Sequence, residues 1–257
     1  MPATIGRLQW DQVSERIYET GDRNVALYVY KDTETTFTDT DGTNDNISIK
    51  THYSEGVAWN GITAMTESPS GAEATDLWAD DTKYATLRSA EQFGGTIEAY
   101  TYPDEWEQCD GSVTLNGVTL GQQKRRQFSL AYITTVGNDT ELNDFGEKIH
   151  LVYAATASPS ERSYATINDS PEAITFSWEY TTSPVDVGTI NNVEYKKVAC
   201  LTLSSRKICY NADGTANSAG KAKWDAFKDI LFGKTVSGTP TIDPHLPMPA
   251  DVISFFQ

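Results

Sequence analysis

Alternating apolar and polar residues at positions 174–181 predict a β-strand with one buried face. The apolar positions are Ile174, Phe176, Trp178 and Tyr180. A shorter β-rich run lies at 148–154, and the segment between the two runs is rich in Ser, Pro, Asn and Asp, which favour turns. We therefore expect two strands of one sheet, joined by a structured loop.

Further strands are expected at 25–30, 57–65, 81–88, 96–102 and 124–135. Thr, Tyr, Val and Ile dominate these runs, and Gly, Pro, Ser and Asp separate them. Because no helical pattern separates these strands, the sequence predicts a mainly β fold, an antiparallel β-sandwich or barrel.

The clearest helix is expected at 218–233. Ser218 can cap its start, and Gly233 ends it. Its apolar residues fall on one face, namely Trp224, Phe227, Ile230 and Leu231. We expect this one flanking α-helix to pack that face on the sheets.

Two segments are expected to lie outside the core. Residues 31–56 are rich in Thr, Asp, Asn and Gly, which predicts a long extended loop that contacts another subunit or forms a hairpin in solvent. Residues 240–257 hold four prolines and end in ISFFQ, which predicts an extended C-terminal arm on the subunit's own surface or on a neighbour. If a neighbour binds it, deleting residues 243–257 weakens assembly without unfolding the domain.

The charge balance disfavours a surface that grips nucleic acid. The chain has 36 acidic and 20 basic residues, a formal charge of −16. Residues 1–110 hold 21 acids and 7 bases, and residues 111–257 hold 15 acids and 13 bases. At 257 residues the chain can bury a core without disulfides or metal. The three cysteines have no metal-ligand spacing, and we expect reduced thiols.

No window approaches the roughly 20 apolar residues of a membrane span. The opening residues, MPATIGRLQW, contain neither a basic n-region nor an apolar h-region. We therefore expect a protein that is made and kept in the cytosol, without membrane contact.

The candidate catalytic and binding motifs lack the residue spacing that their chemistry requires. GTANSAGKA resembles a phosphate loop, but five residues instead of four separate Gly214 from Gly220, and Ala222 replaces the metal-binding hydroxyl. DTDGTNDN at 39–46 has its glycine at the wrong position for a calcium loop, and the three histidines form no ligand pair. We expect no catalytic residue, no cofactor, no metal ligand and no enzymatic activity.

Residues 98–111, EAYTYPDEWEQCDG, combine aromatic side chains with carboxylates, as sugar-binding clefts do. A carbohydrate-binding or glycoside-hydrolysing β-sandwich is therefore an alternative, with Tyr100, Tyr102 and Trp106 contacting the sugar. The other interpretation is a strand that Pro103 breaks into an acidic turn.

Three stretches resemble the major tail (tail tube) proteins of long-tailed, non-contractile, siphovirus-type bacteriophages. They are GVAWNGITAMTESPSGAEATDLWADDTKY at 56–84, GTIEAYTYPDEWEQCDG at 95–111, and residues 121–185, beginning GQQKRRQFSLAYITTVGNDT. The resemblance implies that residues 1–257 form a single tail tube domain of the β-sandwich type. Such proteins are structural virion proteins whose hexameric rings stack into a hollow tube for DNA ejection. The location implied is the virion tail, after synthesis in the host cytoplasm.

The resemblance also implies partners. These are further copies of the chain, other tail proteins such as tape measure, terminator and distal tail proteins, and genomic DNA in transit only. A non-stacking tail protein such as a terminator is an alternative.

The resemblance further implies two sets of surface residues. The acids expected to line the lumen are Glu98, Asp104, Glu105 and Glu107. Subunit contacts are expected from the N-terminal residues 2–10, the 31–56 loop and the C-terminal arm. The candidate contact residues are Ile5, Leu8, Trp10, Phe37, Ile47, Ile49, Tyr53, Ile253, Phe255 and Phe256.

Overall fold

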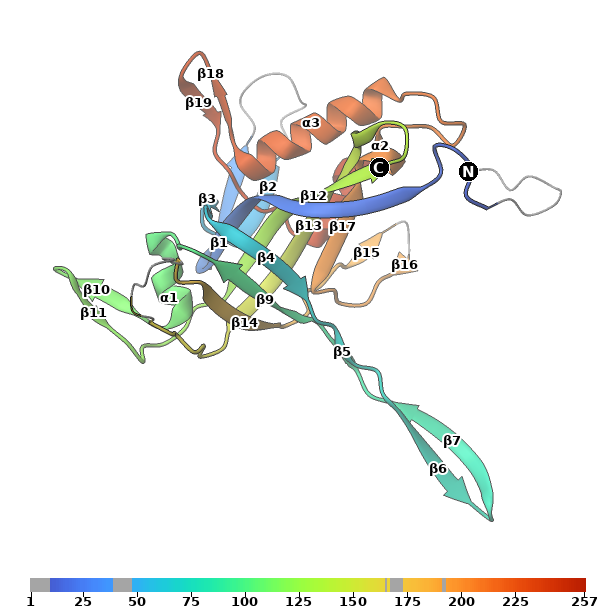
Figure 1. The fold of residues 1–257 in the computed structure, drawn as a ribbon, viewed down its shortest axis with the longest axis horizontal. Coiled ribbons are helices and arrows are strands. Elements are labelled where there is room, and N and C mark those ends of the chain that lie inside the picture. The colour runs from blue at the N-terminus through green and yellow to red at the C-terminus, as the bar shows by residue number, and fades with distance from the viewer. Residues whose placement is uncertain (1–9, 39–47, 165, 167–172, 191–192) are drawn as a thin grey trace.

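The computed structural model describes residues 10–38, 48–164, 166, 173–190 and 193–257. A nine-stranded antiparallel sheet dominates it, in the order β2-β1-β12-β13-β14-β9-β4, with β17 beside β13 and β3 beside β1 (Figure 1). The strands are β1 (Ile17–Thr38), β2 (Ser48–Tyr53), β3 (Val57–Ala58), β4 (Ile62–Glu67), β9 (Gly94–Ala99), β12 (Phe128–Asn138), β13 (Leu142–Ala157), β14 (Phe176–Thr182) and β17 (Cys200–Ser204). The predicted mainly β, antiparallel fold is confirmed at this level.

The strands expected at 148–154 and 174–181 lie in one sheet, as β13 and β14. They pair over a short stretch only, Ala155–Ala157 of β13 against Tyr180–Thr182 of β14. Most of the expected 148–154 strand pairs instead with β17, from Lys148 to Val152. Because β17 belongs to the main sheet, the C-terminal third of the chain contributes to the same body.

The sheet curves so that its two halves enclose a first core. Leu27 and Phe128 come from one half, and Ile97 and Trp178 come from the other; all four are buried. The short helices η1 (Asp104–Trp106) and α1 (Glu107–Asp110) close one end of this core. The strand expected at 96–102 therefore ends at Ala99, and the acidic turn expected after it is helical.

A second core lies on the other face of β1, β12 and β13, under α3 (Ser218–Phe232) and α4 (Pro249–Phe256). The predicted apolar face of α3 is confirmed, because Trp224, Phe227, Ile230 and Leu231 are all buried. Tyr28 of β1 donates a 2.6 Å hydrogen bond to the carbonyl of Leu231. The sheet is thus an apolar layer between two cores.

Two details of the helix prediction were wrong. Asn217, rather than Ser218, is the N-cap, and its side chain accepts a 3.0 Å hydrogen bond from the Gly220 amide. The single flanking helix is also incomplete, because α4 and the short α2 (Ser205–Ile208) pack beside it. Proline suits the first turn of a helix, where its missing amide costs nothing, so Pro249 begins α4 rather than preventing it.

The predicted extended arm at 240–257 is wrong for residues 249–256, which form a helix. The hairpin of β18 (Lys234–Val236) and β19 (Thr239–Ile242) leads into this segment, and α4 ends it. Leu246 and Val252 are buried in the second core. Thr51 donates a 2.7 Å hydrogen bond to the Leu246 carbonyl. The segment therefore packs on the subunit's own surface, one of the two predicted outcomes.

The predicted long loop at 31–56 is largely a β-hairpin arm. Its first part continues β1 to Thr38, and β2 pairs back against it from Ser48. Thr51 and Tyr53 of β2 are buried, because the arm returns to the second core. Residues 39–47 lie outside the described residues.

Smaller hairpins extend from this body. They are β6–β7 (Ala74–Ala79 and Thr82–Arg88), which continues the short β5–β8 pair (Ser70–Gly71 and Glu91–Gln92), then β10–β11 (Val113–Leu115 and Val118–Leu120) and β15–β16 (Thr189–Ile190 and Val193–Glu194). Figure 1 shows β6–β7 and β10–β11 projecting from opposite sides of the sheet.

In the described part of the chain, no helix combines the length and apolarity needed to span a membrane.

Gly220→Ala is expected to destabilise the protein although alanine favours helices by about 1 kcal/mol over glycine. A Cβ at Gly220 would overlap the backbone carbonyl oxygen of Ile208, which cannot move like a flexible side chain. We expect a loss of about 1–3 kcal/mol in the free energy of unfolding, measured by urea denaturation. Ala222→Gly, on the exposed face of α3, is the control and should lose about 1 kcal/mol. An increased stability of Gly220→Ala would contradict this close contact.

Candidate assembly surfaces

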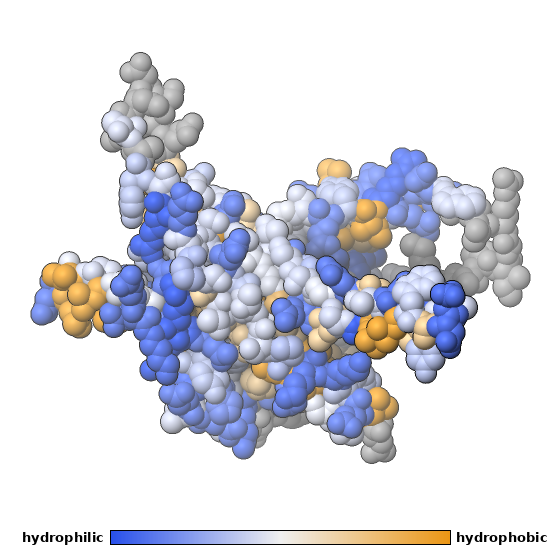
Figure 2. Space-filling view, turned by 90° about the horizontal axis from the view of Figure 1, so that it is seen from below, coloured by the Kyte–Doolittle hydropathy of each residue, from blue (hydrophilic) through white to orange (hydrophobic). Residues whose placement is uncertain are grey.

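The β10–β11 hairpin presents an aliphatic face that no other part of the described chain covers. Asn116 and Gly117 form its turn with positive φ values of 51° and 81°, as a two-residue hairpin turn requires. Cross-strand pairing places four aliphatic side chains on one face, and they are 39–61% exposed: Val113, Leu115, Val118 and Leu120. They form the apolar patch at the left of Figure 2.

The opposite face of this hairpin is hydrogen-bonded to the body. Thr114 donates a 2.7 Å hydrogen bond to the Glu107 carboxylate, and its hydroxyl lies 2.8 Å from that of Thr119. The return strand is also held, because the Arg126 amide donates a 2.9 Å hydrogen bond to the carbonyl of Gln108. The aliphatic face is therefore held in a fixed, outward position.

The β6–β7 ribbon is a second exposed surface. Leu77 lies opposite Ala85, and Leu87 lies opposite Thr75, so these side chains share one face. The other face carries polar groups together with Trp78, which lies opposite Lys83. Asp76 on this face accepts a 2.8 Å hydrogen bond from Thr86 and forms a 2.7 Å ion pair with Lys83. The large apolar side chains of the ribbon are 42–76% exposed: Leu77, Trp78, Tyr84 and Leu87.

Both hairpins expose more apolar surface than a monomer needs. A two-stranded hairpin without a covering layer is only marginally stable in water, and exposed apolar patches mark contact sites. We therefore take β6–β7 and β10–β11 as the candidate assembly surfaces.

Four of the ten predicted contact residues pack against other parts of the same subunit. Tyr53 is buried, and the Phe37 ring stacks on His245 with centroids 4.3 Å apart. Phe255 and Phe256 pack on Phe227, at 5.6 and 5.1 Å between ring centroids. These four side chains pack within the subunit because the hairpin arm and α4 fold back on the second core. Tyr53 is buried, whereas Phe37, Phe255 and Phe256 are partly exposed, so their contact with another subunit stays a prediction.

The remaining predicted contact residues differ in their positions. Trp10 is exposed. Ile253 is partly buried on α4. Ile49 pairs with Phe37 across β1 and β2. Ile5, Leu8 and Ile47 lie outside the described residues. Among the predicted contact residues whose burial the structure describes, Trp10 has a large, exposed side chain.

The four predicted lumen acids do not share one strand. Glu98 lies on β9, on the face opposite the buried Ile97, and is half-buried. Asp104 and Glu105 are exposed on η1, and Glu107 begins α1, where Thr114 hydrogen-bonds its carboxylate. The structure therefore places these acids on three consecutive elements, β9, η1 and α1.

The aromatic residues proposed for sugar binding do not form an open platform. Trp106 is fully buried against Trp59, with ring centroids 4.6 Å apart. Tyr102 is partly buried and packs edge-on against Phe176 and Trp178, while Tyr100 is exposed. The alternative therefore loses its proposed contact surface.

A cluster of charged groups joins β4 to the neighbouring strands, and sequence analysis did not predict it. Tyr132 donates a 2.5 Å hydrogen bond to Glu67, and the His150 Nδ1 atom lies 3.4 Å from the same carboxylate. Glu19 pairs with Lys148 on the other side of the imidazole, 3.4 Å from Nε2. These contacts link β4 to β1, β12 and β13.

The pKa values of the two carboxyl groups in this cluster, Glu19 and Glu67, are lowered, which favours their charged forms. The His150 imidazole, whose Nδ1 atom lies 3.4 Å from the carboxylate, is the main cause of the lowered pKa of Glu67, and it outweighs the opposing effect of burial. For Glu19, burial raises the pKa, but hydrogen bonds from Lys148 and Thr134 together outweigh it. Both carboxylates therefore stabilise the fold in their ionised form.

We expect the protein to lose stability in acid through this cluster. The pKa of Glu67 lies below its ordinary value of 4.5 in the folded state. Its contribution is therefore present above that value and is lost as the pH falls through the folded-state pKa. Glu67→Gln should weaken the fall in Tm between about pH 5 and pH 3, while the exposed control Glu55→Gln should not. Equal acid sensitivity of Glu67→Gln and wild type would contradict this role.

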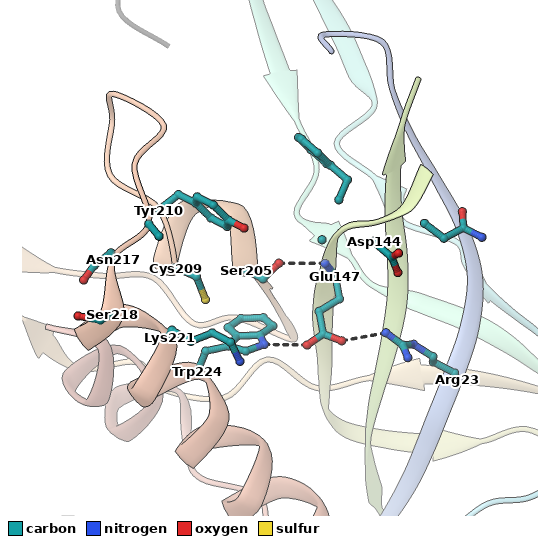
Figure 3. A pocket seen from close by; sticks show the side chains of 14 residues that line it. Arg23, Asp144, Glu147, Ser205, Cys209, Tyr210, Asn217, Ser218, Lys221 and Trp224 are labelled. Carbon is teal, nitrogen blue, oxygen red and sulfur yellow. Dashed lines mark hydrogen bonds and ion pairs between the residues drawn. The ribbon is translucent and has the colours of Figure 1, made fainter. Parts of the chain in front are cut away.

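A cavity of about 560 Å³ opens between the start of α3 and β13 (Figure 3). Glu147 accepts hydrogen bonds from Trp224 Nε1 at 2.8 Å and Lys228 Nζ at 2.7 Å, and it pairs with Arg23 at 2.9 Å. Burial opposes ionisation of Glu147, but the bonds from Lys228 and Trp224 hold its pKa below the ordinary value. This carboxylate thus connects α3 to the sheet.

The same cavity contains no activated thiol in the described structure. Burial raises the pKa of Cys209, whereas a nucleophilic cysteine needs a lowered value. Ser205 Oγ accepts a 2.9 Å hydrogen bond from the Glu147 amide. Among the described residues, no group of three or more His, Cys, Asp or Glu could hold a metal ion. Glu147, Ser205, Asn217 and Lys221 of this cavity all have hydrogen-bonded or ionic partners within the subunit.

No protein family model matches the chain, and no curated protein sequence matches it. Function is therefore inferred from the surfaces of the chain itself.

Proposed function

We propose that this chain is a structural subunit of a phage tail tube of the siphovirus type, which forms hexameric rings that stack into a hollow conduit for DNA. The observation that carries the proposal is the pair of exposed apolar hairpins, β6–β7 and β10–β11, on opposite sides of a two-core β body. A subunit with contact surfaces on opposite sides joins head to tail, which closes rings or builds filaments. The antiparallel sheet agrees with the sandwich fold that such tubes use.

The charge supports a conduit rather than a DNA-binding surface. Each copy carries −16, so a ring of six carries −96. With a Debye length of about 8 Å at physiological salt, only acids close to DNA act on it strongly. Glu98, Asp104, Glu105 and Glu107 remain the proposed lumen residues. The proposed partners are other copies, tape measure, terminator and distal tail proteins, and DNA in transit.

Sedimentation velocity across a concentration series tests this proposal. A tube subunit should convert from monomers into rings and larger particles as its concentration rises. Discrete rings that never grow would favour a terminator. A monomer at every concentration that binds a glycan array would favour the carbohydrate-binding alternative and overturn the proposal.

A further inference from the structure

We infer that the β10–β11 hairpin of one subunit docks on the β6–β7 ribbon of a second copy. This inference rests on the proposed assembly and assigns one specific contact within it. Each surface exposes an aliphatic face that the described part of its own chain leaves uncovered, and the opposite face of each carries polar groups with hydrogen-bonded partners. The two aliphatic faces can therefore cover each other without leaving those polar groups unpaired.

The two apolar surfaces have similar chemistry. Val113, Leu115, Val118 and Leu120 form two cross-strand pairs on the hairpin. On the ribbon, Leu77 and Leu87 share a face with Ala85, and the neighbouring residue Tyr84 lies where the pairing register shifts. Stacking one two-stranded sheet on another lets such side chains interdigitate, as they do between the layers of a sandwich. The contact thus completes a small two-layer core between subunits.

The charges of the two surfaces are complementary. Residues 111–127 contain three basic residues and no acid, namely Lys124, Arg125 and Arg126. None of the three forms an ion pair within the described part of the chain. Residues 73–88 of the ribbon contain four acids and two bases, and Asp80 and Asp81 are exposed at its tip. Because the hairpin base is basic and the ribbon is acidic, a second copy of the chain is the favoured binding partner of each surface.

The backbone places the basic residues at the base of the hairpin. The Gln123 amide donates a 2.8 Å hydrogen bond to the Gly111 carbonyl, so the return segment runs beside the helical cap. In the inferred contact the ribbon and the hairpin lie in opposite directions, so that the ribbon tip with Asp80 and Asp81 faces this base. Lys124 and Arg126, which are exposed, are then available to the acidic tip.

The position of the two surfaces sets the symmetry of the contact. They project from opposite sides of the subunit (Figure 1), so a hairpin-to-ribbon contact is heterologous and leaves one free hairpin and one free ribbon in every dimer. Such a contact continues until a ring closes, which agrees with assembly into hexamers.

Mixing two defective variants tests this contact. The hairpin variant is Leu115→Thr with Val118→Thr, and the ribbon variant is Leu77→Thr with Leu87→Thr. Threonine keeps the strand propensity and removes the aliphatic surface. Thr119→Ser and Thr86→Ser, on the opposite faces, are the matched controls. Sedimentation velocity is measured for each protein alone and for an equimolar mixture of the two defective variants.

Each defective variant should need a roughly tenfold or higher concentration to assemble, because two aliphatic side chains lose their buried position. The controls should assemble like the wild type. The mixture should form a one-to-one heterodimer, through the intact ribbon of one variant and the intact hairpin of the other. Mass spectrometry of the complex, with one variant isotope-labelled, identifies that composition.

Two results would overturn the inference while leaving the proposed function standing. They are wild-type assembly by both defective variants, and the absence of a heterodimer from the mixture when the wild type assembles.

Charge exchange provides a second measurement: Lys124→Asp with Arg126→Asp should weaken assembly, and adding Asp80→Lys with Asp81→Lys should restore it. Failure of restoration would contradict the contact at the ribbon tip. A wild type that never assembles would instead contradict the proposed function.

Discussion

Trp106→Ala is expected to lower the free energy of unfolding by about 3–5 kcal/mol, one of the two largest effects we predict. Trp106 is fully buried at the closed end of the first core. Its ring lies 4.6 Å from Trp59, 4.8 Å from Phe128 and 5.4 Å from Trp178, measured between centroids. Removing the indole leaves a cavity between strands from both halves of the sheet, which cannot collapse without moving them.

Urea denaturation followed by tryptophan fluorescence and circular dichroism measures this loss. Tyr100→Ala is the control from the same segment, because its side chain is exposed, and it should change stability by no more than about 0.5 kcal/mol. A loss below about 1 kcal/mol for Trp106→Ala would show that η1 and α1 do not close the core as described.

Truncation after Ile242 is expected to prevent stable folding, rather than only to weaken assembly. The deleted residues 243–257 include Leu246 and Val252, which are buried in the second core. They also provide the carbonyls of Leu246 and Pro247, which accept hydrogen bonds from Thr51 at 2.7 Å and Tyr153 at 3.0 Å. Their loss exposes α3 and leaves two buried hydroxyls without acceptors, which costs several kcal/mol in total.

Deletion of residues 74–88 is a control of equal length, since both deletions remove 15 residues. The ends of the ribbon are joined by the 3.3 Å hydrogen bond from the Ser89 amide to the Glu73 carbonyl, so a short Gly-Gly turn can replace it. Thermal melting should be nearly unchanged for the ribbon deletion and lost for the C-terminal truncation. A cooperative, wild-type melting transition for the truncated chain would mean that α4 is dispensable.

The sequence patterns predicted those elements whose apolar residues recur at the regular spacing of a strand or a helix. Phe128 and Trp178 belong to predicted strands, and the four apolar residues of α3 occupy one face as expected. The C-terminal segment was predicted wrongly because prolines were taken to prevent a helix, although Pro249 occupies a helix start. A hairpin at 31–56 was one of the two predicted outcomes, but its burial was not predicted, since Thr51 and Tyr53 are buried by contacts with residues distant in sequence.

The candidate surfaces could be predicted only in part. The segment VTLNGVTL contains an Asn-Gly turn between matching strands, a clear hairpin signal that we did not use. Only one strand of the ribbon, at 81–88, was predicted, because Asp80 and Asp81 do not form a standard glycine turn. The cluster of Glu19, Glu67 and His150 spans three distant strands, so no local spacing could predict it.

Negative-stain electron microscopy of the purified protein, across a concentration series, tests the central claim most directly. We predict hollow rings with six-fold symmetry at intermediate concentration and long hollow tubes at high concentration. Solid or irregular aggregates, or a monomer at every concentration, would contradict the proposal that this chain forms a tube.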